Sequence, residues 1–383
     1  MDIYLTDEQL ALRAEVRTYL DEVWPPTRVA AMERNEEYPD DFYRDCARNG
    51  WTAIPVPPEF GGRGGSVVDL CVFVEEVGKT SISLATLYIT GTIFGSHALE
   101  ICGSDEQRAH YLPAVVSGDA RFALAMSEPG AGSDFAAMTT RATRLEGGRW
   151  CLDGLKGPIS GAERAEVIIC AARTSTDPDS RRRGISLFLL DGDTPGVSFR
   201  RCQFPAMRGL MVDDVILDGV EVDGDAMLGA EGDGWINLAR LMDPERLANA
   251  AQAVGVAQAA VDLAVAHATE REQYGGPIGR FQAVSHPLAE SYAEIAAARL
   301  LVYAAAAKRD LEGPCPFEVS MAKTFANNVA MRAADRALQT GGAHGYAAES
   351  PFMRRFLEAR GCELGGGTSQ IQRNIIAHHL GLR

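Results

Sequence analysis

The length and composition of the chain indicate a multidomain enzyme. Its 383 residues are 46% hydrophobic, enough to bury two or three sizeable cores, which excludes a single small binding module. The formal net charge of -15 argues against nucleic acid or an anionic membrane as a partner, because no basic stretch is long enough to overcome that field.

The cysteines and the N-terminus favour a cytoplasmic protein. Eight cysteines occur without a Cys-x-x-Cys pair or a metal-like histidine spacing, so we expect reduced thiols and no metal site. Residues 1–4 contain neither a charged leader nor an apolar core, and no secretory signal is expected.

Residues 1–121 are predicted to form a helical domain. Thr6 and Gln9 match a capping box, in which each side chain bonds the backbone amide of the other, and the prolines at 25–26 are expected to stop the helix that begins there. Ser104 is predicted to cap a further helix that ends at Pro113. Helical periodicity also covers 41–49, 67–78 and 82–102.

Residues 122–230 are predicted to form a small antiparallel sheet domain. Short runs rich in β-branched and aromatic residues alternate here with turn residues such as the glycine pair at 147–148. The strand-like runs are 150–152, 167–170, 185–190, 197–199 and 215–217.

Residues 231–383 return to helical periodicity. We expect two long alanine-rich helices joined by a basic, glycine-containing corner at 271–277, the first ending near His267 and the second starting near Phe281. The order of helices, sheet and helices predicts an α+β fold whose last part is a helical bundle.

The first of these long helices carries the residue on which the chemistry is expected to depend. Asp243 is predicted to cap it, Pro244 to be its first residue, and Glu245 to lie in its first turn. A carboxylate is then held at a buried helix end.

Five ordered motifs carry a resemblance to a known family. They are 103–113 (GSDEQRAHYLP), 124–134 (LAMSEPGAGSD), 271–275 (REQYG) followed by Phe281 and Gln282, 339–345 (QTGGAHG) and 367–373 (GTSQIQR). The chain resembles the acyl-CoA dehydrogenase family over essentially its whole length. The resemblance implies an N-terminal helical domain, a central antiparallel β domain and a C-terminal four-helix bundle.

The resemblance also implies a homotetrameric flavoprotein that binds FAD and removes two hydrogens across the α,β bond of an acyl thioester. The thioester would be carried by CoA or by a carrier protein, and electron-transfer flavoprotein or oxygen would accept the electrons. The implied FAD contacts are Leu124, Met126, Ser127, Ser160, Arg271, Gln273, Gln282, Gln339, Gly342, Ala343, Thr368 and Gln370. Those from Arg271 to Ala343 would reach the FAD of a neighbouring subunit, and Thr368 and Gln370 would complete that contact. The implied substrate contacts are Ser133, Asp243, Arg246 and Gly367.

The usual catalytic base of this family is absent. The commonest family pattern has a glutamate directly before the Gly-Thr-Ser segment, where this chain has Gly366. The Gly366 amide remains, and the family uses an amide here to bond the thioester carbonyl. Glu245 precedes Arg246 on the turn that holds the base in the isovaleryl-CoA and long-chain branches. We therefore expect Glu245, its pKa raised by burial but opposed by Arg246 and the helix start, to abstract the α-proton while flavin N5 accepts the β-hydride.

Two departures and several alternatives qualify this interpretation. Pro158 stands where the family often has a tryptophan over the flavin, and Gly365 replaces an aromatic residue of the substrate wall, so bulky acyl groups are expected. One alternative is that Glu245 has no catalytic role and forms an ion pair with an arginine. Glu363 is a second candidate base. The alternative functions are oxidation of a carrier-bound aminoacyl thioester such as a prolyl thioester, a flavin monooxygenase, and a non-catalytic partner subunit.

Overall fold

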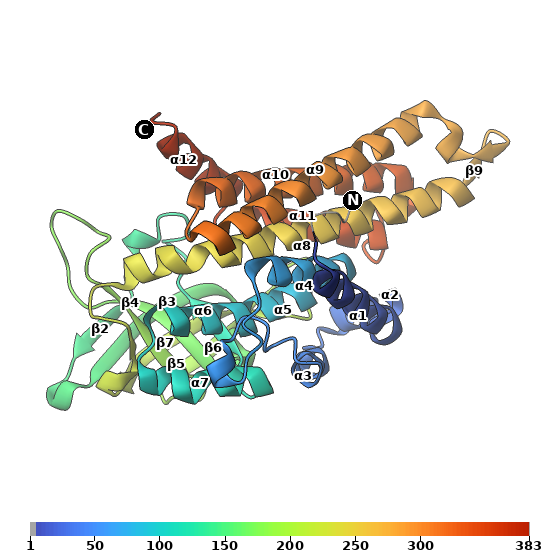
Figure 1. The fold of residues 1–383 in the computed structure, drawn as a ribbon. Coiled ribbons are helices and arrows are strands. Elements are labelled where there is room, and N and C mark those ends of the chain that lie inside the picture. Colours follow the sequence, from blue (N-terminus) through green and yellow to red (C-terminus); the bar gives the residue numbers. More distant parts are fainter. Residues whose placement is uncertain (1–4, 383) are drawn as a thin grey trace.

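The computed structural model describes residues 5–382, and its elements follow the predicted order of helices, sheet and helices (Figure 1). Residues 1–4, to which the expectation about a secretory signal refers, lie outside the described range. The first helices are α1 (Asp7–Val23), α2 (Pro26–Asn35), α3 (Asp40–Arg48), α4 (Val67–Thr80), α5 (Ile82–Tyr88), α6 (Gly95–Cys102) and α7 (Asp105–Ser117), with a π-helical segment, Ile89–Phe94, between α5 and α6.

Capping side chains define where several of these helices begin. Thr6 and Ser104 each accept a hydrogen bond from the amide three residues on, whose own side chain bonds back, so both predicted helix starts are confirmed. The predicted end of α7 was wrong, because the helix continues through Pro113 to Ser117. Proline removes only one backbone hydrogen bond there, and burial of Leu112 and Val115 outweighs that loss.

One sheet of eight strands forms the middle of the chain. The strands are β1 (Phe122–Ala125), β2 (Arg141–Arg144), β3 (Trp150–Ser160), β4 (Val167–Arg173), β5 (Ile185–Asp191), β6 (Val197–Cys202), β7 (Val212–Val222) and β8 (Met227–Leu228). Their order is β6-β7-β3-β2-β4-β5-β8, with β1 beside β4. Most pairs are antiparallel as predicted. β1 and β4 pair in parallel, because the chain crosses over through β2 and β3 between them.

The C-terminal part is a bundle of long helices. They are α8 (Gly234–Glu270), α9 (Gln282–Glu312), α10 (Pro316–Gly345), α11 (Pro351–Leu364) and the shorter α12 (Ser369–His379). Between α8 and α9 lies the predicted corner, a hairpin of β9 (Glu272–Gln273) and β10 (Gly276–Pro277). The sheet lies at the end of the molecule where α8 begins, and the hairpin lies at the opposite end (Figure 1).

Small residues let the N-terminal helices pack directly on this bundle. A Cβ built on Gly255 of α8 would stand 2.2 Å from the carbonyl oxygen of Glu75 on α4, so only glycine allows this approach. Alanines dominate the same core along α8 and α10. The long helix α8 therefore contacts all three parts of the chain and places its side chains between them.

Among residues 5–382 one stretch, Ile82–Cys102, is long and apolar enough to cross a membrane by length and composition alone. Within the folded chain, 89% of its apolar window is buried. The stretch is a core element that packs against α8 and the sheet.

Candidate active site

Glu245 lies inside a long helix and not at its start. The prediction that Asp243 caps a helix beginning at Pro244 was wrong, because α8 is continuous from Gly234 through Pro244. A proline inside a helix removes one backbone hydrogen bond, and the close packing of α8 on both sides keeps the helix intact. The Asp243 carboxylate accepts a hydrogen bond from the Cys315 amide at 3.0 Å, at the start of α10. Asp243 therefore ties α8 to the residue that precedes α10 and does not cap α8.

The carboxylate of Glu245 faces the glycine turn, residues 365–367. Glu245 is 3% exposed, and its Oε2 has no hydrogen-bond partner. A Cβ built on Gly366 would stand 2.3 Å from Glu245 Oε1 and 2.9 Å from Oε2. Gly366 also has φ +60°, a conformation that favours glycine. The Glu245 carboxylate thus occupies the space into which a side chain at position 366 would project.

Buried charges surround this carboxylate. Burial raises the pKa of Glu245, and the positive charges of Lys323 and Arg246 oppose the rise. Lys323, on α10, is completely buried, and burial lowers its pKa to about 8 against the attraction of Glu245. Burial also lowers the pKa of the Arg246 guanidinium. The expected influence of a helix start is absent, because Glu245 lies well inside α8.

Lys323 and Gln372 hold the backbone of the glycine turn. Lys323 Nζ donates to the carbonyl oxygens of Gly365 and Gly367 at 2.7 and 3.2 Å, and Gln372 Nε2 donates to that of Gly367 at 2.9 Å. A trans peptide points its C=O and N–H in opposite directions, so the Gly366 amide points away from Lys323. In the part of the chain that the structure describes, the amides of Gly366 and Gly367 donate to no acceptor. They are free to bond a ligand oxygen.

The predicted substrate contacts fall into two places. Arg246 and Gly367 lie beside Glu245, since a Cβ on Gly367 would stand 3.7 Å from an Arg246 terminal nitrogen. Arg246 Nε is buried and has no hydrogen-bond partner. Ser133 lies apart from them, on the exposed connection between β1 and β2. Glu363, the second candidate base, pairs with an arginine of its own helix, α11.

Predicted FAD contacts lie together at the ends of β1 and β3. Leu124 belongs to β1, Met126 and Ser127 follow it, and Ser160 ends β3. The Ser127 carbonyl accepts a hydrogen bond from the Gly157 amide at 2.9 Å, which brings the two segments side by side. All four predicted residues are half-buried. Two apolar side chains and two hydroxyls of this kind fit a flat heterocycle such as the isoalloxazine ring of FAD.

A buried ion pair, which the sequence analysis missed, fixes this loop. Lys156 is completely buried, with Nζ 3.0 Å from Glu128 Oε1 and 3.2 Å from the Met126 carbonyl oxygen. The Glu128 carboxylate also accepts hydrogen bonds from the amides of Thr139 at 2.7 Å and Thr140 at 2.9 Å. Burial raises the pKa of Glu128, but these hydrogen bonds and the charge of Lys156 outweigh burial and lower that pKa to about 2. The loop is therefore held from inside the sheet.

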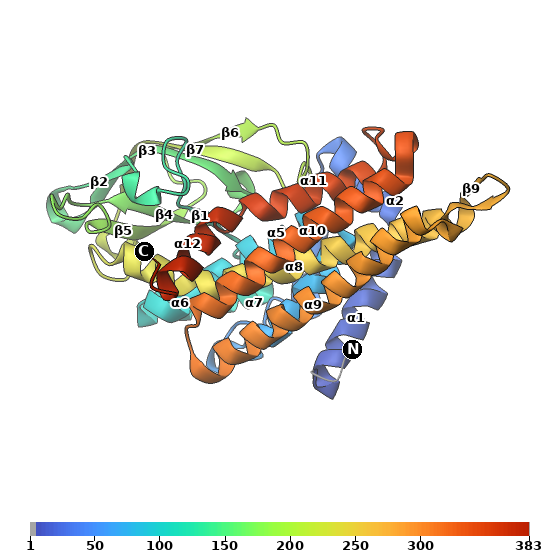
Figure 2. The same cartoon turned by 90° about the horizontal axis from the view of Figure 1, so that it is seen from above.

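The other predicted FAD contacts lie at the far end of the bundle. These contacts are exposed and surround the hairpin and the end of α10. They are Arg271, Gln273, Gln282, Gln339, Gly342 and Ala343. From Glu245 to the end of α8 the helix is roughly 40 Å long, so one chain does not bring both groups into one site. Figure 2 shows the hairpin projecting at the end opposite the sheet. An arginine, carboxamides and glycine amides suit the diphosphate part of FAD.

Two further predicted contacts flank the glycine turn. Thr368 Oγ1 accepts a hydrogen bond from the Ile371 amide at 3.3 Å and caps α12. Gln370 is exposed in the first turn of α12. Both residues are close in sequence to Gly366 and far from the hairpin of the same chain.

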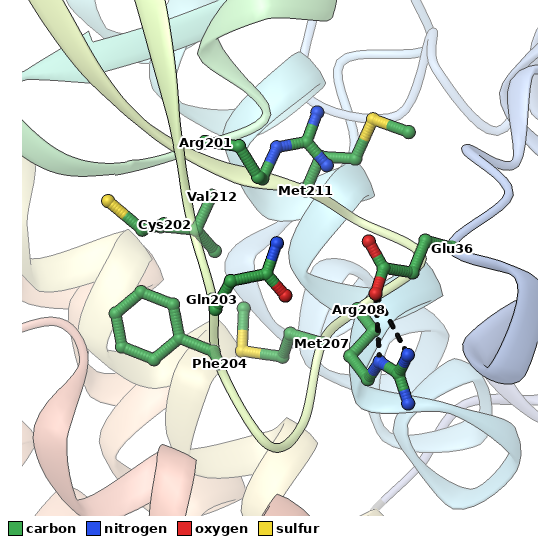
Figure 3. Close-up of a pocket in the computed structure, with 9 residues that line it drawn as sticks. All are labelled: Glu36, Arg201, Cys202, Gln203, Phe204, Met207, Arg208, Met211 and Val212. Atoms are coloured by element: carbon green, nitrogen blue, oxygen red, sulfur yellow. Dashed lines mark hydrogen bonds and ion pairs between the residues drawn. The ribbon is translucent and has the colours of Figure 1, made fainter.

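A small pocket beside the β6–β7 loop is separate from these groups. Its lining residues are Glu36, Arg201, Cys202, Gln203, Phe204, Met207, Arg208, Met211 and Val212 (Figure 3). The ion pair between Arg208 and Glu36, at 2.8 Å, closes one side. With a volume of about 10 Å³ the pocket holds no more than one water molecule, so it does not bind a substrate.

Family models, related sequences and solved structures all match this chain over nearly its whole length. Models of the N-terminal, middle and C-terminal domains of acyl-CoA dehydrogenase match residues 6–119, 123–220 and 232–381. An acyl-CoA dehydrogenase of Bacillus subtilis (strain 168) is 34% identical over 380 residues, 99% of each chain. Butyryl-CoA dehydrogenase from Megasphaera elsdenii superposes with a TM-score of 0.94 at 29% identity over 100% of both chains. The prolyl acyl carrier protein oxidase AnaB superposes with a TM-score of 0.91 at 25% identity, over 98% of this chain and 100% of that chain.

These matches define an oxidoreductase that acts on CH–CH bonds and uses FAD as its cofactor. The chain belongs to the acyl-CoA dehydrogenase family. The predicted fold, with N-terminal helices, a middle β domain and a C-terminal helical domain, is confirmed.

Proposed function

We propose that this enzyme dehydrogenates the α,β bond of an acyl thioester and that Glu245 is the base that removes the α-proton. The observation that supports this role is the buried Glu245 carboxylate set directly against Gly366, with Oε2 unpartnered. Within residues 5–382, no ion pair shorter than 4.0 Å joins Glu245 to an arginine, which speaks against a purely structural role. The carboxylate is free to accept a proton.

The chain supplies the groups that proton transfer requires. The α-proton of a thioester is weakly acidic, so its removal needs a donor to the developing negative charge on the carbonyl oxygen. The free amide of Gly366, oriented by the hydrogen bonds of Lys323, provides that donor. Burial brings the pKa of Glu245 closer to the working pH, which favours proton transfer to its carboxylate. FAD supplies the acceptor for the β-hydride, and Leu124, Met126, Ser127 and Ser160 would hold its ring.

The separation of the predicted FAD contacts supports a cofactor site shared between subunits, as in the homotetramer that the resemblance implies. We propose that the group at the far end of one bundle, from Arg271 to Ala343, completes the FAD site of a neighbouring subunit together with Thr368 and Gln370 of that neighbour. The exposure of Arg271 and Gln273 leaves them available to a second chain. The eight cysteines are free, which supports a cytoplasmic location. Electron-transfer flavoprotein or oxygen is the proposed electron acceptor.

The second candidate function is oxidation of an aminoacyl thioester, such as a prolyl thioester, on a carrier protein. The structural similarity to the prolyl acyl carrier protein oxidase favours it, as does the space beside Gly365. A Cβ built there would make only ordinary contacts, at 3.8 Å, and the missing aromatic side chain would leave room for a ring or a branch of the acyl group. CoA and carrier proteins share the pantetheine arm, so the residue at position 365 does not distinguish between them.

Anaerobic bleaching of the flavin by a panel of CoA and carrier-bound thioesters tests the proposed function. We expect at least one thioester to bleach the wild-type protein. Glu245→Gln is expected to retain FAD but to be reduced about 10²- to 10⁴-fold more slowly. Glu363→Gln is the matched control and is expected to be reduced at the wild-type rate. A wild-type rate in Glu245→Gln would refute the proposed base.

A further inference from the structure

Asn249 carries a buried carboxamide that has no hydrogen-bond partner. It lies on α8 one turn after Glu245 and therefore on the same face of the helix. Asn249 is 9% exposed, and its Oδ1 is buried without a partner. In the described part of the chain, the side-chain nitrogen Nδ2 makes no hydrogen bond either. Since buried amides almost always find partners, the partner of this one is expected to be a ligand.

A neighbouring carboxamide shows the contrast. Gln252, on the next turn of α8, is 1% exposed. Its Oε1 accepts a hydrogen bond from Thr86 at 3.1 Å, and its Nε2 donates to Cys362 Sγ at 3.7 Å. The protein thus satisfies the buried amide of Gln252 from two sides and leaves that of Asn249 unsatisfied.

The carboxamide of Asn249 faces the open side of the glycine turn. A Cβ built on Gly365 would stand 3.8 Å from Asn249 Nδ2, and the only other atom within 4 Å is the Gly361 carbonyl oxygen. Glu245 meets Gly366 in the same way, at 2.3 Å. Successive turns of α8 therefore face successive residues of the glycine turn. A substrate whose α-carbon lies at Glu245 and whose acyl chain runs along α8 would pass Asn249 on the next turn.

We propose that Asn249 is a specificity-determining residue and that the acyl group of the substrate carries a hydroxyl group that hydrogen-bonds to the Asn249 carboxamide, whose Nδ2 is the atom nearest the glycine turn. This inference rests on the proposed function, because it places the acyl group between α8 and the glycine turn. Residues four apart on a helix are separated by about 6 Å along its axis. The hydroxyl therefore belongs on the γ or δ carbon of the acyl chain. A hydrocarbon chain leaves the Asn249 carboxamide unpaired and binds more weakly.

Two pairs of CoA thioesters test the proposal, each pair exchanging a terminal hydroxyl for a methyl group. They are 4-hydroxybutanoyl-CoA against pentanoyl-CoA, and 5-hydroxypentanoyl-CoA against hexanoyl-CoA. The readout is the anaerobic rate of flavin bleaching at limiting thioester. In at least one pair, the wild type is expected to favour the hydroxylated thioester by about 10-fold or more. Asn249→Leu is expected to lose that preference, and Asn249→Asp, which keeps an acceptor oxygen, to retain it.

The outcomes separate this inference from the proposed function. Equal rates within both pairs, or a preference for both hydrocarbons in the wild type, refute the role of Asn249 while bleaching still supports dehydrogenation. A hydroxyl preference that persists in Asn249→Leu refutes it as well. If Asn249→Leu does not hold FAD, the comparison is made between the wild type and Asn249→Asp. Loss of the preference for hydroxylated thioesters in Asn249→Asp then refutes the proposal. If none of the four thioesters bleaches the wild type although another thioester of the panel does, this inference is refuted and the proposed function stands, whereas no bleaching by any thioester of the panel refutes both.

Discussion

Replacing Gly366 by alanine tests the contact on which the assignment of the base depends. The added Cβ would stand 2.3 Å from Glu245 Oε1, whereas real Cβ atoms keep at least 3.0 Å, so the carboxylate has to retreat by about 0.7 Å. Displacement of a reacting group by about 1 Å costs on the order of 10²-fold in rate. Alanine at φ +60° adds about 1–2 kcal/mol of backbone strain.

The assay is the rate of flavin reduction by a saturating thioester, together with the free energy of unfolding in urea. We expect Gly366→Ala to lower the rate by about 10²-fold and the stability by about 1–2 kcal/mol. Gly365→Ala is the matched control, because its Cβ would have only ordinary contacts at 3.8 Å and its φ is not left-handed. If Gly366→Ala reduces its flavin as fast as Gly365→Ala, the Glu245 carboxylate is not the base.

Two further variants probe the groups around the site. Lys323→Met removes a positive charge that opposes the raised pKa of Glu245, so the pH range in which the reduction rate rises should move to higher pH. Ser320→Ala, which removes a neutral hydrogen bond of 2.9 Å to Gln372, should leave that profile in place, and an unshifted Lys323→Met profile would contradict the argument. Arg271→Ala should be purified with less FAD at unchanged helix content, whereas Arg332→Ala, an exposed arginine paired with an acid of α9, should keep FAD. Full FAD content in Arg271→Ala would show that the far end of the bundle does not complete a cofactor site.

Local sequence patterns predicted most helices and strands correctly, but they placed the start of α8 at the wrong residue. The capping boxes at Thr6 and Ser104 depend on residues three apart, and both formed as expected. The Asp243–Pro244 pair is also typical of a helix start, yet α8 runs through it. Packing of α8 between two other parts of the chain decides the outcome there, and no local pattern contains that information. The domain boundaries after residues 121 and 230 stay a prediction.

The surroundings of the candidate base were the least predictable part. Glu245 was found from the resemblance, but Lys323 and Asn249 were missed, because their roles depend on a glycine turn distant in the sequence. A signal did exist in each case. Lys323 interrupts an alanine-rich helix, and Lys156 interrupts an otherwise largely apolar strand. A charged residue on a buried face needs a partner, so both lysines marked sites where a carboxylate or carbonyl groups had to be close.

The location of the carboxylate on α8 separates two tasks that one loop would otherwise share. In the proposed mechanism, the turn between α11 and α12 would shape the wall beside the acyl group, while the proton acceptor would belong to the long helix α8. Position 366 has to remain small because the carboxylate fills its space, whereas a Cβ at position 365 would make only ordinary contacts. Larger residues at 365 are therefore a means of narrowing the range of accepted acyl groups, and such enzyme variants would keep their proton acceptor in place.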